Sequence, residues 1–240
     1  MRNLVVMFLL VFTSGCEETP MAYPWLTELD AGDGVKHSGQ RLMSLDFGLH
    51  PLEPVDQQTN MLIGVHGYAS EGYEWVYPLQ TLDNQETASY FFRWDFTECA
   101  APSAETLRQS ITQLLKASPH LESVRVVGHS FGGVLVSHLL ADWSPAVPIE
   151  VHAIAAPLAG MGGITGRCDY APPSAIADNM SFHQWRTQHH LDSAFKALDQ
   201  DPQIIELTKG SAVVLPDTYR TFRLGHNWSI SWVADELTSM

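Results

Sequence analysis

Ser130 lies in a segment whose residue types and spacing could support nucleophilic catalysis. Residues 128–133 read GHSFGG, after a valine-rich run at 123–127 and before a long apolar stretch, Phe131–Trp143. This order predicts a strand, a sharp turn and a helix, with the serine at the turn. Glycines two residues before and after the serine would make room for a strained turn. Such a serine can attack a carbonyl carbon and carry the acyl group; a purely structural Gly-Ser turn is the alternative.

A second segment could stabilise the negative charge that this attack creates. The apolar run Met61–Val65 leads directly into the sequence HGY at residues 66–68. Acyl transfer needs two N–H donors fixed in advance near the carbonyl oxygen. We expect the N–H group of Phe131 to be one donor and that of Tyr68 to be the other. The alternative is that the His-Gly pair only ends a strand.

The serine also needs a histidine to take its proton. Where a serine follows a strand in this way, the chain order is serine, acid, histidine. His226 is our candidate base, because it follows the last predicted strand and begins the last predicted helix. His183, His189 and His190 are alternatives, as a second base or a metal group. Adjacent histidines on an extended segment point to opposite sides and chelate poorly, so we interpret these three as surface or site-lining residues.

A carboxylate must then hold this histidine in the right tautomer. We favour Asp192, which comes just after the predicted strand Met180–Arg186, and keep Asp169 as the second choice. The other aspartates after the serine lie at the wrong end of a strand or beyond a helical turn, and we interpret them as solvated surface charges: Asp178, Asp199, Asp201 and Asp217.

These residues must be positioned by alternating strands and helices. From residue 61 onward, short apolar runs alternate with helix-like stretches, which is typical of buried parallel strands with crossover helices. The predicted strands are Met61–Val65, Tyr90–Phe96, Ser123–Val127, Ile149–Ala155, Met180–Arg186 and Thr218–Arg223. The predicted helices are Ala104–Ala117, Phe131–Trp143 and His226–Leu237. Before these elements, apolar and polar residues nearly alternate over Arg41–Phe47, which predicts an edge strand. Residues 158–178 are rich in Gly and Pro and predict a short lid-like loop.

With these motifs in order, the chain resembles the α/β-hydrolase superfamily over residues 60–240, particularly its small bacterial lipases and esterases. The resemblance implies an α/β fold: a mostly parallel central sheet flanked by helices in a three-layer sandwich. It also implies a serine hydrolase that forms an acyl-enzyme on Ser130, releases an alcohol with a proton from His226, and needs no metal or organic cofactor. Ester cleavage is the expected reaction. Acyltransferase, thioesterase and peptidase activity remain alternatives, as does a non-catalytic anchored binding protein.

The first sixteen residues predict export. Arg2 precedes an apolar run at residues 4–12 that is too short to span a bilayer, as in a secretory signal. The following TSGC resembles a lipobox, which predicts cleavage and lipid attachment at Cys16. Thr13 departs from the usual leucine, so ordinary signal cleavage stays open. We expect a membrane-anchored bacterial lipoprotein on the periplasmic side or cell surface, or otherwise a secreted or periplasmic protein.

With Cys16 used for the lipid, Cys99 and Cys168 are the two remaining cysteines of the chain. In an oxidising compartment such a pair is commonly bridged, so we expect a disulfide between them.

Length and composition narrow the remaining choices. Residues 17–240 fit one domain with a single core, and we expect a monomer. The net charge of -14 excludes nucleic acid as a partner, because binding its phosphates requires many Lys and Arg side chains. A small-molecule or lipid ester is the expected ligand.

Overall fold

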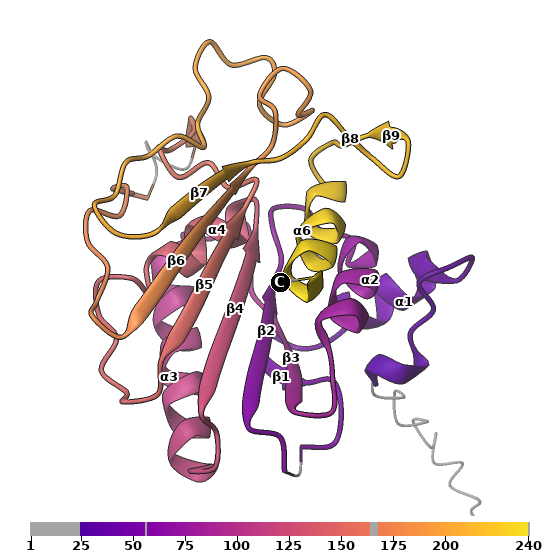
Figure 1. Cartoon of the computed structure of the whole chain (residues 1–240), viewed down its shortest axis with the longest axis vertical. Coiled ribbons are helices and arrows are strands. Elements are labelled where there is room, and N and C mark those ends of the chain that lie inside the picture. The colour runs from indigo at the N-terminus through magenta and orange to yellow at the C-terminus, as the bar shows by residue number, and fades with distance from the viewer. Residues whose placement is uncertain (1–24, 56, 164–167, 240) are drawn as a thin grey trace, which may run out of the picture.

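The structure is a computed structural model that describes residues 25–55, 57–163 and 168–239 (Figure 1). The predicted signal and Cys16 lie outside these residues. A seven-stranded sheet in the order β1-β3-β2-β4-β5-β6-β7 forms the centre of the molecule. Its strands are β1 (Gly48–Pro51), β2 (Asn60–Val65), β3 (Thr87–Arg93), β4 (Ser123–His129), β5 (Ile149–Ile154), β6 (Met180–Arg186) and β7 (Ser211–Val214). Only β1 is antiparallel to its neighbour.

Helices cover both faces of this sheet. They are the 3-10 helix η1 (Leu26–Glu28), α1 (Val35–Met43), α2 (Tyr73–Leu82), α3 (Ala100–Ala117), α4 (Phe131–Ser137) and α6 (Trp228–Ser239). Figure 1 shows α1, α2 and α6 on one side and α3 and α4 on the other. The predicted three-layer α/β arrangement is therefore confirmed. Among the described residues, no helix combines the length and the apolar character needed to cross a membrane.

The hydrophobic core has two layers, one on each face of the sheet, because successive side chains of a strand point to opposite faces. In β4, Val124 and Val126 pack into the core under α3 and α4, whereas Val127 packs into the core under α2 and α6. Both faces of this central parallel strand are buried from Val126 to His129, whereas Ser123 and Arg125 near its start are only partly buried. On α3, Leu107 and Ile111 are fully buried at a spacing of four, so one face of the helix lies on the sheet.

The predicted edge strand at Arg41–Phe47 is wrong. Arg41 and Met43 lie in the last turn of α1, and the edge strand is β1 instead. The buried residues of α1 include Ser38 and Gly39, and a Cβ on Gly39 would come within 2.3 Å of the Tyr73 backbone nitrogen. Leu42 is fully buried in the core, with Val35 and Met43 packed against the same cluster. Ser38 and Gly39 occupy the middle of this buried stripe, so its helical period is weak in the sequence.

The last predicted strand, Thr218–Arg223, is also wrong as a member of the sheet. It forms a separate ribbon of β8 (Thr218–Tyr219) and β9 (Phe222–Arg223), turned by Arg220 and Thr221 at φ values of 47° and 70°. The seventh strand of the sheet is β7, whose four residues are all exposed. Exposure at the sheet edge removes the apolar alternation by which a strand is recognised.

Other differences concern the ends of elements. The strand predicted at Tyr90–Phe96 runs instead from Thr87 to Arg93, and α4 ends at Ser137, six residues earlier than predicted. Helix α2 was not predicted, and it contains Pro78, a residue that ordinarily indicates a helix end.

Candidate active site

Ser130 lies at the tip of a sharp turn between β4 and α4. Its backbone has φ 54° and ψ -122°, a conformation that residues with a side chain rarely adopt. The two flanking glycines are required by contact: a Cβ on Gly128 would lie 2.5 Å from the Gly132 carbonyl oxygen, and one on Gly132 would lie 2.3 Å from the Val65 carbonyl oxygen. The turn predicted from the sequence is thus present, with the serine presented at the carboxyl end of the sheet.

Asp192 and His226 are brought together at the same end. Asp192 Oδ2 lies 2.8 Å from His226 Nδ1, and the carboxylate is completely buried. Thr187 Oγ1 donates to Oδ2 at 2.5 Å, and the Ala194 backbone N–H donates to Oδ1 at 2.8 Å. Burial by itself would raise the pKa of Asp192, but the hydrogen bonds and charge of its partners, His226 first, hold it below its ordinary value.

The ionised carboxylate decides which nitrogen of His226 carries the proton. A carboxylate can only accept, so neutral His226 must donate from Nδ1, which leaves the lone pair on Nε2. His226 follows the β8–β9 ribbon and precedes α6, and its ring packs against His129 and Phe195 at centroid distances of 4.7 and 5.1 Å. Ser130 and His226 line the same two cavities. The unprotonated nitrogen, Nε2, therefore belongs to an imidazole that lines both cavities together with Ser130.

The loop after β2 packs directly on the serine. A Cβ on Gly67 would come within 2.9 Å of both Ser130 Cβ and the His129 carbonyl oxygen, so only glycine fits there. Tyr68 follows it, and Phe131 begins α4, where the N–H groups of the first turn have no partner within the helix. Both residues line the larger cavity beside Ser130. Their role as oxyanion donors remains a prediction.

His66, which the sequence shows only as part of a motif, has a structural role in this loop. It is completely buried, and its Nε2 accepts hydrogen bonds from the Arg93 side chain at 2.9 Å and from the Trp94 backbone N–H at 3.3 Å. Its Nδ1 lies 3.0 Å from the Gly67 carbonyl oxygen. Burial, together with the Arg93 charge, lowers the pKa of His66 to about 4. His66 is therefore a neutral brace that fixes the loop carrying Gly67 and Tyr68.

The larger of the two cavities has a volume of 490 Å³ and a mostly apolar wall. Phe96, Phe131, Met161 and Phe195 supply much of that wall, and Glu98 adds a carboxylate at its edge. The wall is built largely from loops that follow the strands.

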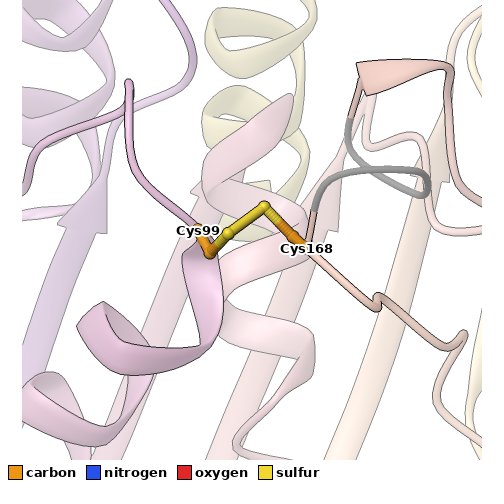
Figure 2. Close-up of a disulfide and its surroundings, with 2 residues drawn as sticks. All are labelled: Cys99 and Cys168. Atoms are coloured by element: carbon orange, nitrogen blue, oxygen red, sulfur yellow. A yellow bond between two sulfur atoms is a disulfide. The ribbon is translucent and has the colours of Figure 1, made fainter.

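Cys168 lines this cavity and is joined to Cys99 by a disulfide (Figure 2). The Cα atoms are 5.5 Å apart, so the predicted bridge is present. Cys99 immediately precedes α3, and Cys168 lies in the loop between β5 and β6 and lines the larger cavity. The bridge therefore ties the loop after β3 to the loop predicted to act as a short lid.

The hydrogen bond between Asp192 and His226 does not include the alternative candidates, although the His189 carbonyl oxygen accepts from the Asp192 backbone N–H at 3.3 Å. Asp169 is exposed in the loop just after Cys168. His189 Nε2 lies 2.9 Å from the Phe195 carbonyl oxygen, and His190 is exposed.

One group of described residues has the composition of a metal site: Glu150, His152 and His183, whose ligand atoms lie within 4.8 Å of one another. Trp185 Nε1 donates to His152 Nδ1 at 2.9 Å, and an indole can only donate. The proton of neutral His152 therefore lies on Nε2, the nitrogen that faces Glu150 at 3.4 Å. A metal ligand would need that lone pair. Arg125 already pairs with Glu150 at 2.6 Å, so this is an ion-pair cluster.

Comparisons with known proteins bear on the fold. No family model matches the chain, and no curated protein matches it. Among solved structures, a serine hydrolase without a lid from Xanthomonas campestris aligns with a TM-score of 0.50 and 16% identity over 80% of this chain and 85% of that chain. A lipase-esterase related protein from Clostridium acetobutylicum aligns with a TM-score of 0.52 and 11% identity over 80% and 98%.

A third solved structure, a candidate thioesterase from Silicibacter, aligns with a TM-score of 0.51 and 17% identity over 93% of both chains. At these identities the likeness concerns the course of the backbone. Together with the parallel sheet, the flanking helices and the strained serine turn after β4, it shows that this chain has the α/β-hydrolase fold.

Proposed function

We propose that this protein is an exported serine hydrolase that cleaves carboxylic esters through an acyl-enzyme on Ser130. The observation that carries the proposal is the hydrogen bond between the buried carboxylate of Asp192 and His226, beside a cavity that Ser130 also lines. A base oriented by a buried carboxylate next to a strained serine is the arrangement that nucleophilic acyl transfer requires.

The reaction has two halves. His226 Nε2 takes the proton of Ser130 as its oxygen attacks the ester carbonyl, and the N–H groups of Tyr68 and Phe131 bind the resulting oxyanion. His226 then gives the proton to the departing alcohol, which leaves the acyl group on the serine. In the second half, water replaces the alcohol, His226 takes a proton from the water, and the carboxylic acid departs from the restored serine.

The apolar wall of the 490 Å³ cavity supports an ester with an apolar acyl chain. The disulfide between Cys99 and Cys168 supports the exported part of the proposal, since such bridges persist in oxidising compartments. Attachment to a membrane through a lipid on Cys16 belongs to the same proposal.

A fluorophosphonate probe tests the nucleophile directly. We expect the wild-type protein to be labelled and to hydrolyse p-nitrophenyl butyrate, and Ser130→Ala to lose labelling and about 10⁴-fold or more in kcat. Ser123→Ala is the matched control, because Ser123 lies at the opposite end of the same strand. It should be labelled like the wild type. A folded wild-type protein that neither labels nor turns over esters would overturn the proposal.

A further inference from the structure

A second and smaller cavity adjoins the candidate site. It has a volume of 190 Å³ and shares Ser130 and His226 with the larger cavity. Its remaining wall comes from the loop at residues 67–71, from the start of α2, from His129 and from Asn227. The groups here are mainly polar, in contrast to the aromatic wall of the larger cavity. The proposed mechanism uses Ser130, His226 and the Tyr68 N–H group from this wall and assigns no role to its other residues.

Glu74 is the unusual residue of this smaller cavity. It lies in the first turn of α2 and is only 8% exposed. Its Oε1 accepts a hydrogen bond from Ser70 Oγ, but its Oε2 is buried and has no hydrogen-bond partner among the described residues. Burial raises the pKa of Glu74, so this carboxyl loses its proton only at a pH above its ordinary range. The ionised carboxylate then keeps a buried acceptor without a donor, which is unfavourable, and a donor in the cavity would satisfy it.

The neighbouring groups decide what that occupant can be. Glu71 lines the same cavity and is exposed, and Asn227 Nδ2 is already directed to the Tyr73 hydroxyl at 3.3 Å. No lysine or arginine is among the described residues that line this cavity. Two carboxyl groups, those of Glu71 and Glu74, therefore line this cavity, with no lysine or arginine of the described chain beside them. Such a site repels an acid and suits a group that brings its own hydrogen-bond donor.

The position of the cavity decides which half of an ester it would hold. In ester cleavage the departing oxygen takes its proton from the histidine, so the alcohol must lie beside both the serine and the histidine. The apolar cavity suits the acyl chain, and the polar cavity remains for the alcohol. Resting on the proposed function, we propose that the Glu74 cavity is the leaving-group subsite, and that Glu74 accepts a hydrogen bond from a second hydroxyl of a glycol- or glycerol-type alcohol.

Esters that differ at one group test this subsite. We would compare kcat/KM for three esters: 2-hydroxyethyl butyrate, n-propyl butyrate and 2-methoxyethyl butyrate. In the propyl ester a methyl group replaces the hydroxyl, and in the methoxyethyl ester a methyl group caps the hydroxyl oxygen. The methoxy ester controls for the electron-withdrawing oxygen. At alkaline pH, where Glu74 is ionised despite its raised pKa, we expect the wild type to prefer the hydroxyethyl ester over both by about tenfold, in the range for a hydrogen bond to a charged acceptor. A cationic choline ester compared with 3,3-dimethylbutyl butyrate separates hydroxyl recognition from simple attraction of positive charge.

Glu74→Met removes the acceptor while keeping the side-chain volume, and it should reduce the hydroxyethyl preference to about twofold or less. Glu53→Gln is the control, since Glu53 is another partly buried carboxyl that contacts the Ser89 backbone, away from the cavity. Its preference should equal that of the wild type. The preference is a ratio, so a lower yield of folded variant does not alter it.

The outcomes separate this subsite from the proposed function. If the wild type hydrolyses all three butyrate esters with equal kcat/KM, the esterase proposal stands and the subsite is refuted. The subsite is also refuted if the choline ester alone is preferred, or if propyl 4-hydroxybutyrate is preferred over hydroxyethyl butyrate, because the hydroxyl is then read on the acyl side. A wild type that cleaves none of these esters and takes no fluorophosphonate label refutes the proposed function itself.

Discussion

Removal of the Cys99–Cys168 bridge should cost this protein a large part of its stability. The two cysteines are 69 residues apart in sequence, and the loop between them contains the serine turn as well as β4 and β5. Closing a loop of that length restricts the unfolded chain, and the chain-entropy relation gives about 4.4 kcal/mol at 25 °C. For a chain of this size, that loss corresponds to a fall in Tm of about 9 to 18 °C.

The assay is urea and thermal unfolding of the Cys99→Ser/Cys168→Ser double variant beside the oxidised wild type. Wild type treated with dithiothreitol is the second comparison, and it should unfold at the same midpoint as the double variant because both lack the same bond. A free energy of unfolding within about 1 kcal/mol of the oxidised wild type would refute the reasoning. It would mean that the unfolded chain is already compact enough for the bridge to restrict little.

Two further substitutions have outcomes that follow from contacts of single carboxyls. Asp192→Asn should lower kcat for p-nitrophenyl butyrate by about 10⁴-fold, because an amide facing His226 favours the wrong tautomer. The control, Asp169→Asn at an exposed position, should keep kcat within about twofold of the wild type. Equal losses in the two variants would contradict the assignment of Asp192 as the acid. Burial, reinforced by Asp83, raises the pKa of Glu53 to about 7. In the unfolded chain Glu53 releases its proton near pH 4.5, whereas in the folded protein it keeps that proton up to about pH 7. The stability that comes from the bound proton is therefore lost as pH rises toward 7. Glu53→Gln should therefore raise Tm relative to wild type more at pH 8 than at pH 4.5, and a difference independent of pH would contradict the shift.

The parts of the fold that could be predicted from sequence are those with local patterns. The valines of β4 and the glycines around Ser130 report a buried strand and a tight turn within ten residues of chain. Strand β6 was predicted with its observed ends, because Met180 and Phe182 are buried and Ser181 between them is exposed, which gives the alternation of a strand. The candidate histidine and aspartate were found by their order along the chain and their place after strands.

The parts that could not be predicted depend on contacts distant in sequence. Helix α1 is held by small residues against α2, and β7 joins the sheet only through pairing with β6. The same limit applies to the site. His66 and Glu74 look like ordinary polar residues in the sequence, and only the packed structure makes one a neutral brace and the other a buried acceptor without a donor.

The glycine contacts around Ser130 divide the protein into a fixed part and an adaptable part. Gly67 and Gly132 place backbone against backbone, so the serine, the loop carrying Tyr68 and the start of α4 tolerate almost no added atom. The wall of the larger cavity instead comes from side chains such as Met161 and Phe195 on loops between strands. Loops of this kind accept insertions and exchanges. An engineer who seeks a new substrate range should therefore recombine those loops and leave the backbone around the serine untouched.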